Sequence, residues 1–136
     1  MGALYSLKPA AEVKRRILVV DDNLDAVHSM ATLVKMMGHD VRFAINGFAA
    51  LEIAREFRPD VILLDIALPD FTGCEIARQL KWEPDLNHTR FIAISALPAQ
   101  QYKQAALDAG CEQFHSKPIA PAILEEILER PKPTAP

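Results

Sequence analysis

The stretch ILVVDDNLD, residues 17–25, places four apolar residues directly before two adjacent acids. An apolar run of this length is typical of a buried strand, so Asp21 and Asp22 lie where that strand should end. Two carboxylates about 4 Å apart repel each other by roughly 4 kcal/mol at an effective dielectric constant of 20. Something near the strand end should offset this repulsion, and the rest of the chain indicates what it is.

Apolar runs and helical patterns alternate along the chain. The expected strands are residues 17–20, 41–45, 61–65, 91–95 and, more weakly, 113–116. Three of these runs are almost continuously apolar, as expected for strands covered on both faces. Apolar residues at helical spacing mark four helices: Leu24, Val27, Ala31 and Val34; Phe48, Leu51, Ala54 and Phe57; Ile76, Ala77 and Leu80; and Ile119, Ile123, Leu124 and Ile127. Residues 99–110 favour a further helix with few large apolar groups, which we expect to be the least firmly packed.

This alternation predicts an α/β fold: a doubly wound, five-stranded parallel sheet with helices on both faces. Ligands bind such sheets at the carboxyl ends of the strands, where the strand order reverses. Polar residues that could carry phosphoryl chemistry stand at four of these ends: Asp21, Asp22, Asp65, Ser95 and Lys117. Three converging carboxylates suit Mg²⁺ or Mn²⁺. A lysine and a hydroxyl opposite them suit an anion such as a phosphoryl group.

Each of these residues also has an ordinary structural explanation. Asp22 or Asn23 could cap the first helix, which accounts for one acid but not for two. Asp65 alone could be a loop acid, Ser95 a turn residue, and Lys117 a solvated surface lysine. Five such residues at four strand ends favour a common site over five separate explanations.

Composition bounds the remaining possibilities. The chain has 136 residues and a formal net charge of −3, which suits one compact domain and leaves no electrostatic footprint for nucleic acid. No apolar run approaches the roughly 20 residues of a membrane span, and the start lacks a signal peptide's apolar stretch, so we expect a cytoplasmic location. Residues 1–14 read as a lead-in, 15–129 as the domain and 130–136 as a Pro-rich tail. Cys74 and Cys111 are expected to be free thiols in apolar surroundings.

Four segments carry a family resemblance. ILVVDDN, VILLDIALPDFTG, FIAISA and DAGCEQFHSKPI, in this order and at this spacing, resemble the response regulator receiver domains of two-component signalling, the CheY-like family. The resemblance covers roughly residues 15–128. It implies the flavodoxin-like version of the predicted fold, and an activity limited to the domain's own phosphorylation and dephosphorylation rather than a free-standing enzyme.

For the acidic residues, the resemblance implies that Asp65 is the phosphoacceptor. It would attack the phosphoryl group of a phosphohistidine on a histidine kinase or phosphotransfer protein. The family pattern assigns direct contacts with Mg²⁺ to Asp22, Asp65 and the backbone carbonyl of Ala67. Asp21 would act mainly through water.

For the remaining site residues, the family pattern implies that Ser95 donates a hydrogen bond to the phosphoryl group and that Lys117 pairs with it. The bond between Lys117 and Pro118 would be cis. After phosphorylation, Ser95 would move toward Asp65 and leave room for a switch aromatic, which matches Phe114. The surface of the fourth helix, fifth strand and fifth helix would then be read by a downstream protein. A permanently buried core phenylalanine is the alternative for Phe114.

Two positions vary among members of the family. Ala67 has no side chain with which to position water, and Leu97, two residues after Ser95, is apolar where many relatives are small or polar. We expect Leu97 to shield an aspartyl phosphate and slow its hydrolysis.

Other functions fit less well. A phosphorylation-independent pseudo-receiver would not need the complete set of acids with Ser95 and Lys117. A haloacid-dehalogenase-type phosphatase would have a second aspartate at Ala67, and a nucleotide-binding Rossmann domain would show G-x-G-x-x-G after its first strand. A single-domain regulator and the receiver of a hybrid sensor histidine kinase both remain, with the linker-like KPAAEVKRR favouring the second. We expect no direct contact with nucleic acid or membrane, and a monomer or weak dimer.

Overall fold

The structure is a computed structural model that describes residues 13–70 and 72–130. The expected lead-in and tail fall almost entirely outside this range. Within it, no helix is both long and apolar enough to cross a membrane.

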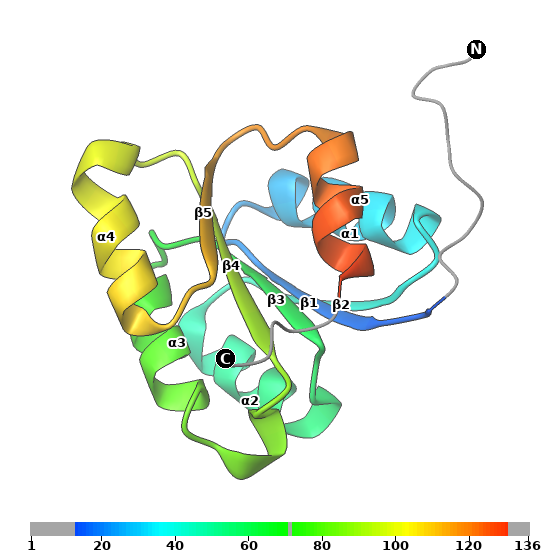
Figure 1. Ribbon diagram of the computed structural model, residues 1–136, viewed down its shortest axis with the longest axis horizontal. Coiled ribbons are helices and arrows are strands. Elements are labelled where there is room, and N and C mark those ends of the chain that lie inside the picture. Colours follow the sequence, from blue (N-terminus) through cyan, green and yellow to red (C-terminus); the bar gives the residue numbers. More distant parts are fainter. Residues whose placement is uncertain (1–12, 71, 131–136) are drawn as a thin grey trace.

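Five parallel strands form a single sheet (Figure 1). The strands are β1 (Arg16–Val20), β2 (Asp40–Ala44), β3 (Val61–Leu64), β4 (Arg90–Ser95) and β5 (Gln113–Ser116). Their order is β2-β1-β3-β4-β5, so the chain reverses direction across the sheet between β1 and β3. The predicted fold class is confirmed, and the carboxyl ends of β1 and β3 are where a ligand site is expected.

Five α-helices cover the two faces of the sheet. They are α1 (Leu24–Met36), α2 (Gly47–Phe57), α3 (Gly73–Leu80), α4 (Ala99–Ala109) and α5 (Pro121–Glu129). Figure 1 shows α1 and α5 on one face and α2, α3 and α4 on the other. A single 3-10 turn, η1 (Pro84–Leu86), joins α3 to β4. Two hydrophobic cores result, one under each layer of helices.

Burial separates central strands from edge strands. Every residue of β3 and β4 is buried, as is β1 after Arg16, which confirms the prediction of strands covered on both faces. In β2, at one edge of the sheet, only Ala44 is fully buried. Both cysteines are free and buried, as predicted.

Three residues of the predicted apolar helix faces do not lie in the core. Leu24, Phe48 and Ile123 are exposed, and Phe48 retains 71% of its accessible surface. Leu24 and Phe48 stand in the first turns of α1 and α2. The helical period was correct, but it does not reveal which apolar residues of a helix remain exposed.

Polar side chains define where the first three helices begin. Asn23, Asn46 and Thr72 each accept a hydrogen bond from the amide three residues later, at the starts of α1, α2 and α3. Asn23 therefore caps α1, and Asp22 is not needed for that role. In α4 only Ala106 and Ala109 are fully buried, in keeping with its expected lack of large apolar anchors.

Candidate functional site

The sheet register brings the first acids and Asp65 to the same edge. Val20 pairs with Leu64, so the residues that follow β1 and β3 emerge side by side. The ladder continues one step further, because the Asp65 amide donates to the Val20 carbonyl at 2.9 Å. Residues far apart in the sequence are thus placed together by backbone hydrogen bonding alone.

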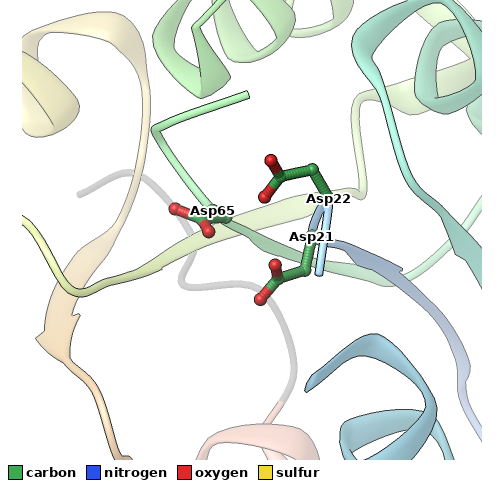
Figure 2. Close-up of side chains that lie close together, drawn as sticks. All are labelled: Asp21, Asp22 and Asp65. Carbon is green, nitrogen blue, oxygen red and sulfur yellow. The ribbon is translucent and has the colours of Figure 1, made fainter. Parts of the chain in front are cut away.

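Asp21, Asp22 and Asp65 form a compact acidic cluster at this edge. One carboxylate oxygen from each lies within 4.8 Å of the others. Figure 2 shows the three side chains turned toward the same side of the strand ends. Asp21 and Asp65 are buried, whereas Asp22 is exposed.

Lys117 enters the cluster from the loop between β5 and α5. Its ammonium donates to Asp21 Oδ2 at 2.6 Å and to Asp65 Oδ2 at 3.1 Å. The Lys117 amide donates to the carbonyl of Ser95, which holds this loop against the end of β4. The peptide bond between Lys117 and Pro118 is cis, as the family pattern implied.

The pKa values of both partners are perturbed. Burial raises the pKa of Asp65 above its ordinary value, although hydrogen bonds from Lys117 and from the Ala67 amide lower it in part. For Lys117, burial alone would lower the pKa, but hydrogen bonds to Asp21 and Asp65 outweigh burial and raise it. Lys117 is therefore held firmly in its charged form.

The second oxygens of the two buried carboxylates are bound by nearby amides. Asp21 Oδ1 accepts from the Asn23 amide at 3.0 Å, and Asp65 Oδ1 accepts from the Ala67 amide at 3.1 Å. These bonds orient the carboxylates.

The charges and donor atoms of this site fit a hard divalent cation. Three carboxylates and one ammonium leave the cluster with an excess of negative charge, and carboxylate oxygens are the ligands that Mg²⁺ prefers. Ala67 follows two residues after Asp65 in an exposed loop, so its peptide group lies next to these oxygens.

An apolar cavity of about 210 Å³ opens beside the cluster. Its walls combine apolar side chains with two acids of the cluster and Lys117. The lining residues come from the central strands, α1 and the β5–α5 loop: Val19, Val20, Asp21, Ala26, Met30, Leu63, Leu64, Asp65, Ile94, Lys117, Pro118 and Ile119. Such walls exclude polar partners from one side of the carboxylates, consistent with the raised pKa of Asp65.

Ser95 and Phe114 lie outside the acidic cluster. Ser95 is fully buried at the end of β4, and its Oγ accepts a hydrogen bond from the Leu97 amide at 3.1 Å. Phe114 is half-buried and packs against the core beneath α2, α3 and α4. Because Phe114 pairs with Ala93, two residues before Ser95, both side chains lie on the same face of the sheet.

Gly73 was recognised in the sequence as part of the family segment, but the contacts that Gly73 and Asp70 make near Asp65 were not predicted. A Cβ on Gly73 would lie 2.5 Å from the Asp65 carbonyl oxygen, so the start of α3 requires glycine to approach the phosphoacceptor candidate. Asp70 accepts hydrogen bonds from the amides of Gly47 and Phe48, at the start of α2. No spacing rule connects Asp70 with a helix that precedes it in the chain.

Comparisons with known proteins agree with this geometry. A family model described as response regulator receiver domain matches residues 17–129. The polar-differentiation response regulator DivK of Brucella anthropi is 35% identical over 114 residues, which cover 83% of this chain and 93% of DivK.

Two solved structures show the same fold at modest identity. The receiver domain of the sensor histidine kinase PA1611 from Pseudomonas aeruginosa PAO1, with a magnesium ion coordinated in its active-site cleft, is 28% identical with a TM-score of 0.79. That match covers 87% of this chain and 97% of the PA1611 domain. The BeF3-activated DrrB receiver domain is 27% identical with a TM-score of 0.76, and the match covers 87% of this chain and 97% of DrrB.

Proposed function

The chain belongs to the response regulator receiver domain family of two-component systems, and we propose that Asp65 is its phosphoacceptor. One observation carries the proposal: the Lys117 ammonium bridges Asp21 and Asp65, with Asp22 within 4.8 Å. This places a positive group and a nucleophilic carboxylate side by side in a mainly negative site.

The proposed reaction transfers a phosphoryl group from a phosphohistidine of a histidine kinase or phosphotransfer protein. A carboxylate oxygen of Asp65 forms the new P–O bond as the P–N bond breaks, and the electron pair of that bond returns to the imidazole. Lys117 pairs with a phosphoryl oxygen, and Ser95 donates a hydrogen bond to another. Because Ser95 acts as an acceptor toward the Leu97 amide, its hydroxyl hydrogen is available for this bond.

Asp22, Asp65 and the Ala67 carbonyl would hold Mg²⁺ directly, and Asp21 would act through water. When bound, the ion offsets the negative charge of the carboxylates and of the incoming phosphoryl oxygens. The acid cluster supports this assignment through its donor atoms and charge. We expect the transfer to take place in the cytoplasm.

The proposed switch follows from the shared sheet face of Ser95 and Phe114. When Ser95 moves toward the phosphoryl group, the half-buried Phe114 ring gains room to turn inward. The surface of α4, β5 and α5 changes with it and is read by a downstream protein. Phenylalanine has no hydroxyl, so its outward position is held by packing rather than by a hydrogen bond.

Beryllofluoride, which imitates a phosphoryl group on a carboxylate, tests the proposal. We expect the protein to bind it in the presence of Mg²⁺, with a rise in Tm, and Asp65→Asn to abolish the rise. Asp60→Asn is the control: it removes a carboxylate that precedes β3, and the rise in Tm should remain. Equal behaviour of the parent and Asp65→Asn would point to a pseudo-receiver instead.

A further inference from the structure

We propose that Asp70 is a positioning residue for the Asp65 site, and this inference rests on the proposed function. Asp70 lies in the loop between β3 and α3, which also contains Ala67. Its two carboxylate oxygens accept from two successive amides of α2, Gly47 at 2.7 Å and Phe48 at 3.0 Å. The loop that follows the phosphoacceptor is thereby fastened to a different helix.

The amides that Asp70 binds are suited to hold a carboxylate. The first amides of a helix have no partner within the helix and carry its positive dipole end. In α2, Asn46 satisfies the Ala49 amide at 2.8 Å, and Asp70 satisfies the two amides before it. Hydrogen bonds to an ionised acceptor are stronger than neutral ones, so this fastening is firmer than an ordinary loop contact.

The loop is held at its base as well as at Asp70. The Gly73 amide donates to the Ile66 carbonyl at 2.8 Å, and the Ala67 amide donates to Asp65 Oδ1 at 3.1 Å. Ala67 therefore lies between a fixed base and the Asp70 attachment. Removal of Asp70 would free one side of the loop and let the Ala67 peptide group move relative to Asp65.

The consequence concerns the metal. A backbone carbonyl can bind a metal well only if the chain segment that carries it is held in place. Loss of a residue that positions a metal ligand typically weakens metal binding about 10- to 100-fold. Asp70 acts through the Ala67 backbone without contacting the ion. We therefore expect Asp70→Ala to weaken Mg²⁺ binding about tenfold, at the low end of that range.

Asn46→Ala provides a matched control. It also removes a side-chain hydrogen bond at the start of α2, but Asn46 bonds an amide of that same helix and does not connect the helix to the loop. Both substitutions should lower stability, Asp70→Ala by more, because Asp70 bonds two helix amides through a carboxylate and Asn46 bonds one through a neutral amide oxygen. Only Asp70→Ala should change the metal site.

Isothermal titration with MgCl₂ tests the proposal on the parent and both variants, alongside urea unfolding. The ¹⁵N–¹H spectra of the metal-free proteins give a second readout. Asp70→Ala should weaken Mg²⁺ binding about tenfold and shift the Ala67 amide signal, and Asn46→Ala should do neither. Asp70→Asn keeps one acceptor oxygen and should be intermediate, which provides the comparison if Asp70→Ala does not fold.

The outcomes separate the two proposals. Equal Mg²⁺ affinity in the parent, Asn46→Ala and the Asp70 variants would overturn the role of Asp70 and leave the Asp65 site intact. Equal weakening by Asn46→Ala and Asp70→Ala would also overturn it, because the effect would then come from α2 alone. A parent without Mg²⁺ affinity would overturn the proposed metal site, and the role of Asp70 with it.

Discussion

Neighbouring side chains at the end of β1 have different surroundings. Asp21 is buried, and its two oxygens are bound by Lys117 and by the Asn23 amide. Asp22 is exposed at the open side of the cluster. The repulsion expected between the two acids is thus offset on one side by an ammonium group, which leaves Asp22 as the carboxylate most accessible to a cation from solution.

Neutralising Asp22 should have opposite effects with and without metal. In metal-free protein, Asp22→Asn removes one of three crowded negative charges and should raise Tm by about 2 °C. For a chain of this size, that rise corresponds to a fraction of a kcal/mol in the free energy of unfolding. In MgCl₂ the rise in Tm caused by the ion should be smaller than in the parent. Thermal unfolding with and without MgCl₂ measures both effects.

Asp25→Asn is the control for this substitution. It makes the same change in charge in the first turn of α1, outside the cluster, where an acid favours the helix. It should lower Tm slightly and leave the effect of Mg²⁺ unchanged. A fall in metal-free Tm for Asp22→Asn would contradict the assignment of repulsion to this acid.

Leu97 should control the lifetime of the phosphorylated state. Its amide binds Ser95 Oγ, and its half-buried side chain packs against the core beside the site. A glutamate at this position would admit and orient water. In Leu97→Glu we therefore expect the aspartyl phosphate to be hydrolysed about tenfold faster, a smaller rate increase than a fully positioned general base gives. Loss of radiolabelled phosphate measures the rate, and an equal or longer lifetime of the aspartyl phosphate in Leu97→Glu would contradict this role of Leu97.

His39 should make stability depend on pH. Its ring is buried, and Nδ1 accepts the Arg15 amide at 3.1 Å, which requires the neutral ring. Burial, together with the charge of Arg15, lowers the pKa of His39 below its usual 6.5. The unfolded chain therefore takes up a proton before the folded protein does, and the free energy of unfolding should fall as the pH drops below 6.5.

His39→Asn tests this account, because Asn offers an acceptor oxygen in place of Nδ1 but does not titrate. Its unfolding free energy should lack the loss between pH 6.5 and 5.5. His88→Asn, at an exposed histidine, should retain it. Urea unfolding at several pH values gives the comparison, and a parallel pH dependence in the parent and His39→Asn would refute it.

At the level of elements, α5 is held to the sheet by a buried arginine. Arg90, at the start of β4, makes two hydrogen bonds to Glu112 and donates to the carbonyls of Ile127 and Arg130 at the end of α5. The bond to Glu112 lowers the pKa of that carboxyl. One side chain thus joins β4, the start of β5 and the last turn of α5. This contact lies at the amino end of β4, whereas the acidic cluster lies at the carboxyl ends of the strands.

Removal of this arginine should be costly. Arg90→Met keeps the bulk but removes the cationic partner of the Glu112 carboxylate and the side-chain donor to two carbonyls at the end of α5. We therefore expect a loss of about 3 kcal/mol and faster hydrogen exchange at the end of α5. Arg55→Met breaks the more exposed pair with Glu83 and should cost under about 1 kcal/mol. Urea unfolding measures both losses, and equal values would contradict the account.

At the scale of the whole molecule, the order of elements and the position of the site were predictable from the sequence. Continuous apolar runs identified the central strands, and the carboxyl ends of the expected strands, including the weaker fifth one, indicated the acidic cluster and Lys117. These signals are local, and the parallel topology combines them.

The remaining features depend on contacts that a sequence period does not encode. Phe48 fits the apolar period of α2 and yet is exposed. The bonds of Asp70 to α2 and of Arg90 to α5 join segments whose approach is set by packing. Such contacts are visible only once the chain is folded.

Mass spectrometry of the intact protein after incubation with acetyl phosphate and MgCl₂ tests the central claim most directly. We predict the gain of one phosphoryl group, absent in Asp65→Asn and strongly reduced when Mg²⁺ is chelated. Phosphorylation that persists in Asp65→Asn, or a parent that gains no phosphoryl group, would contradict the assignment of Asp65 as the phosphoacceptor.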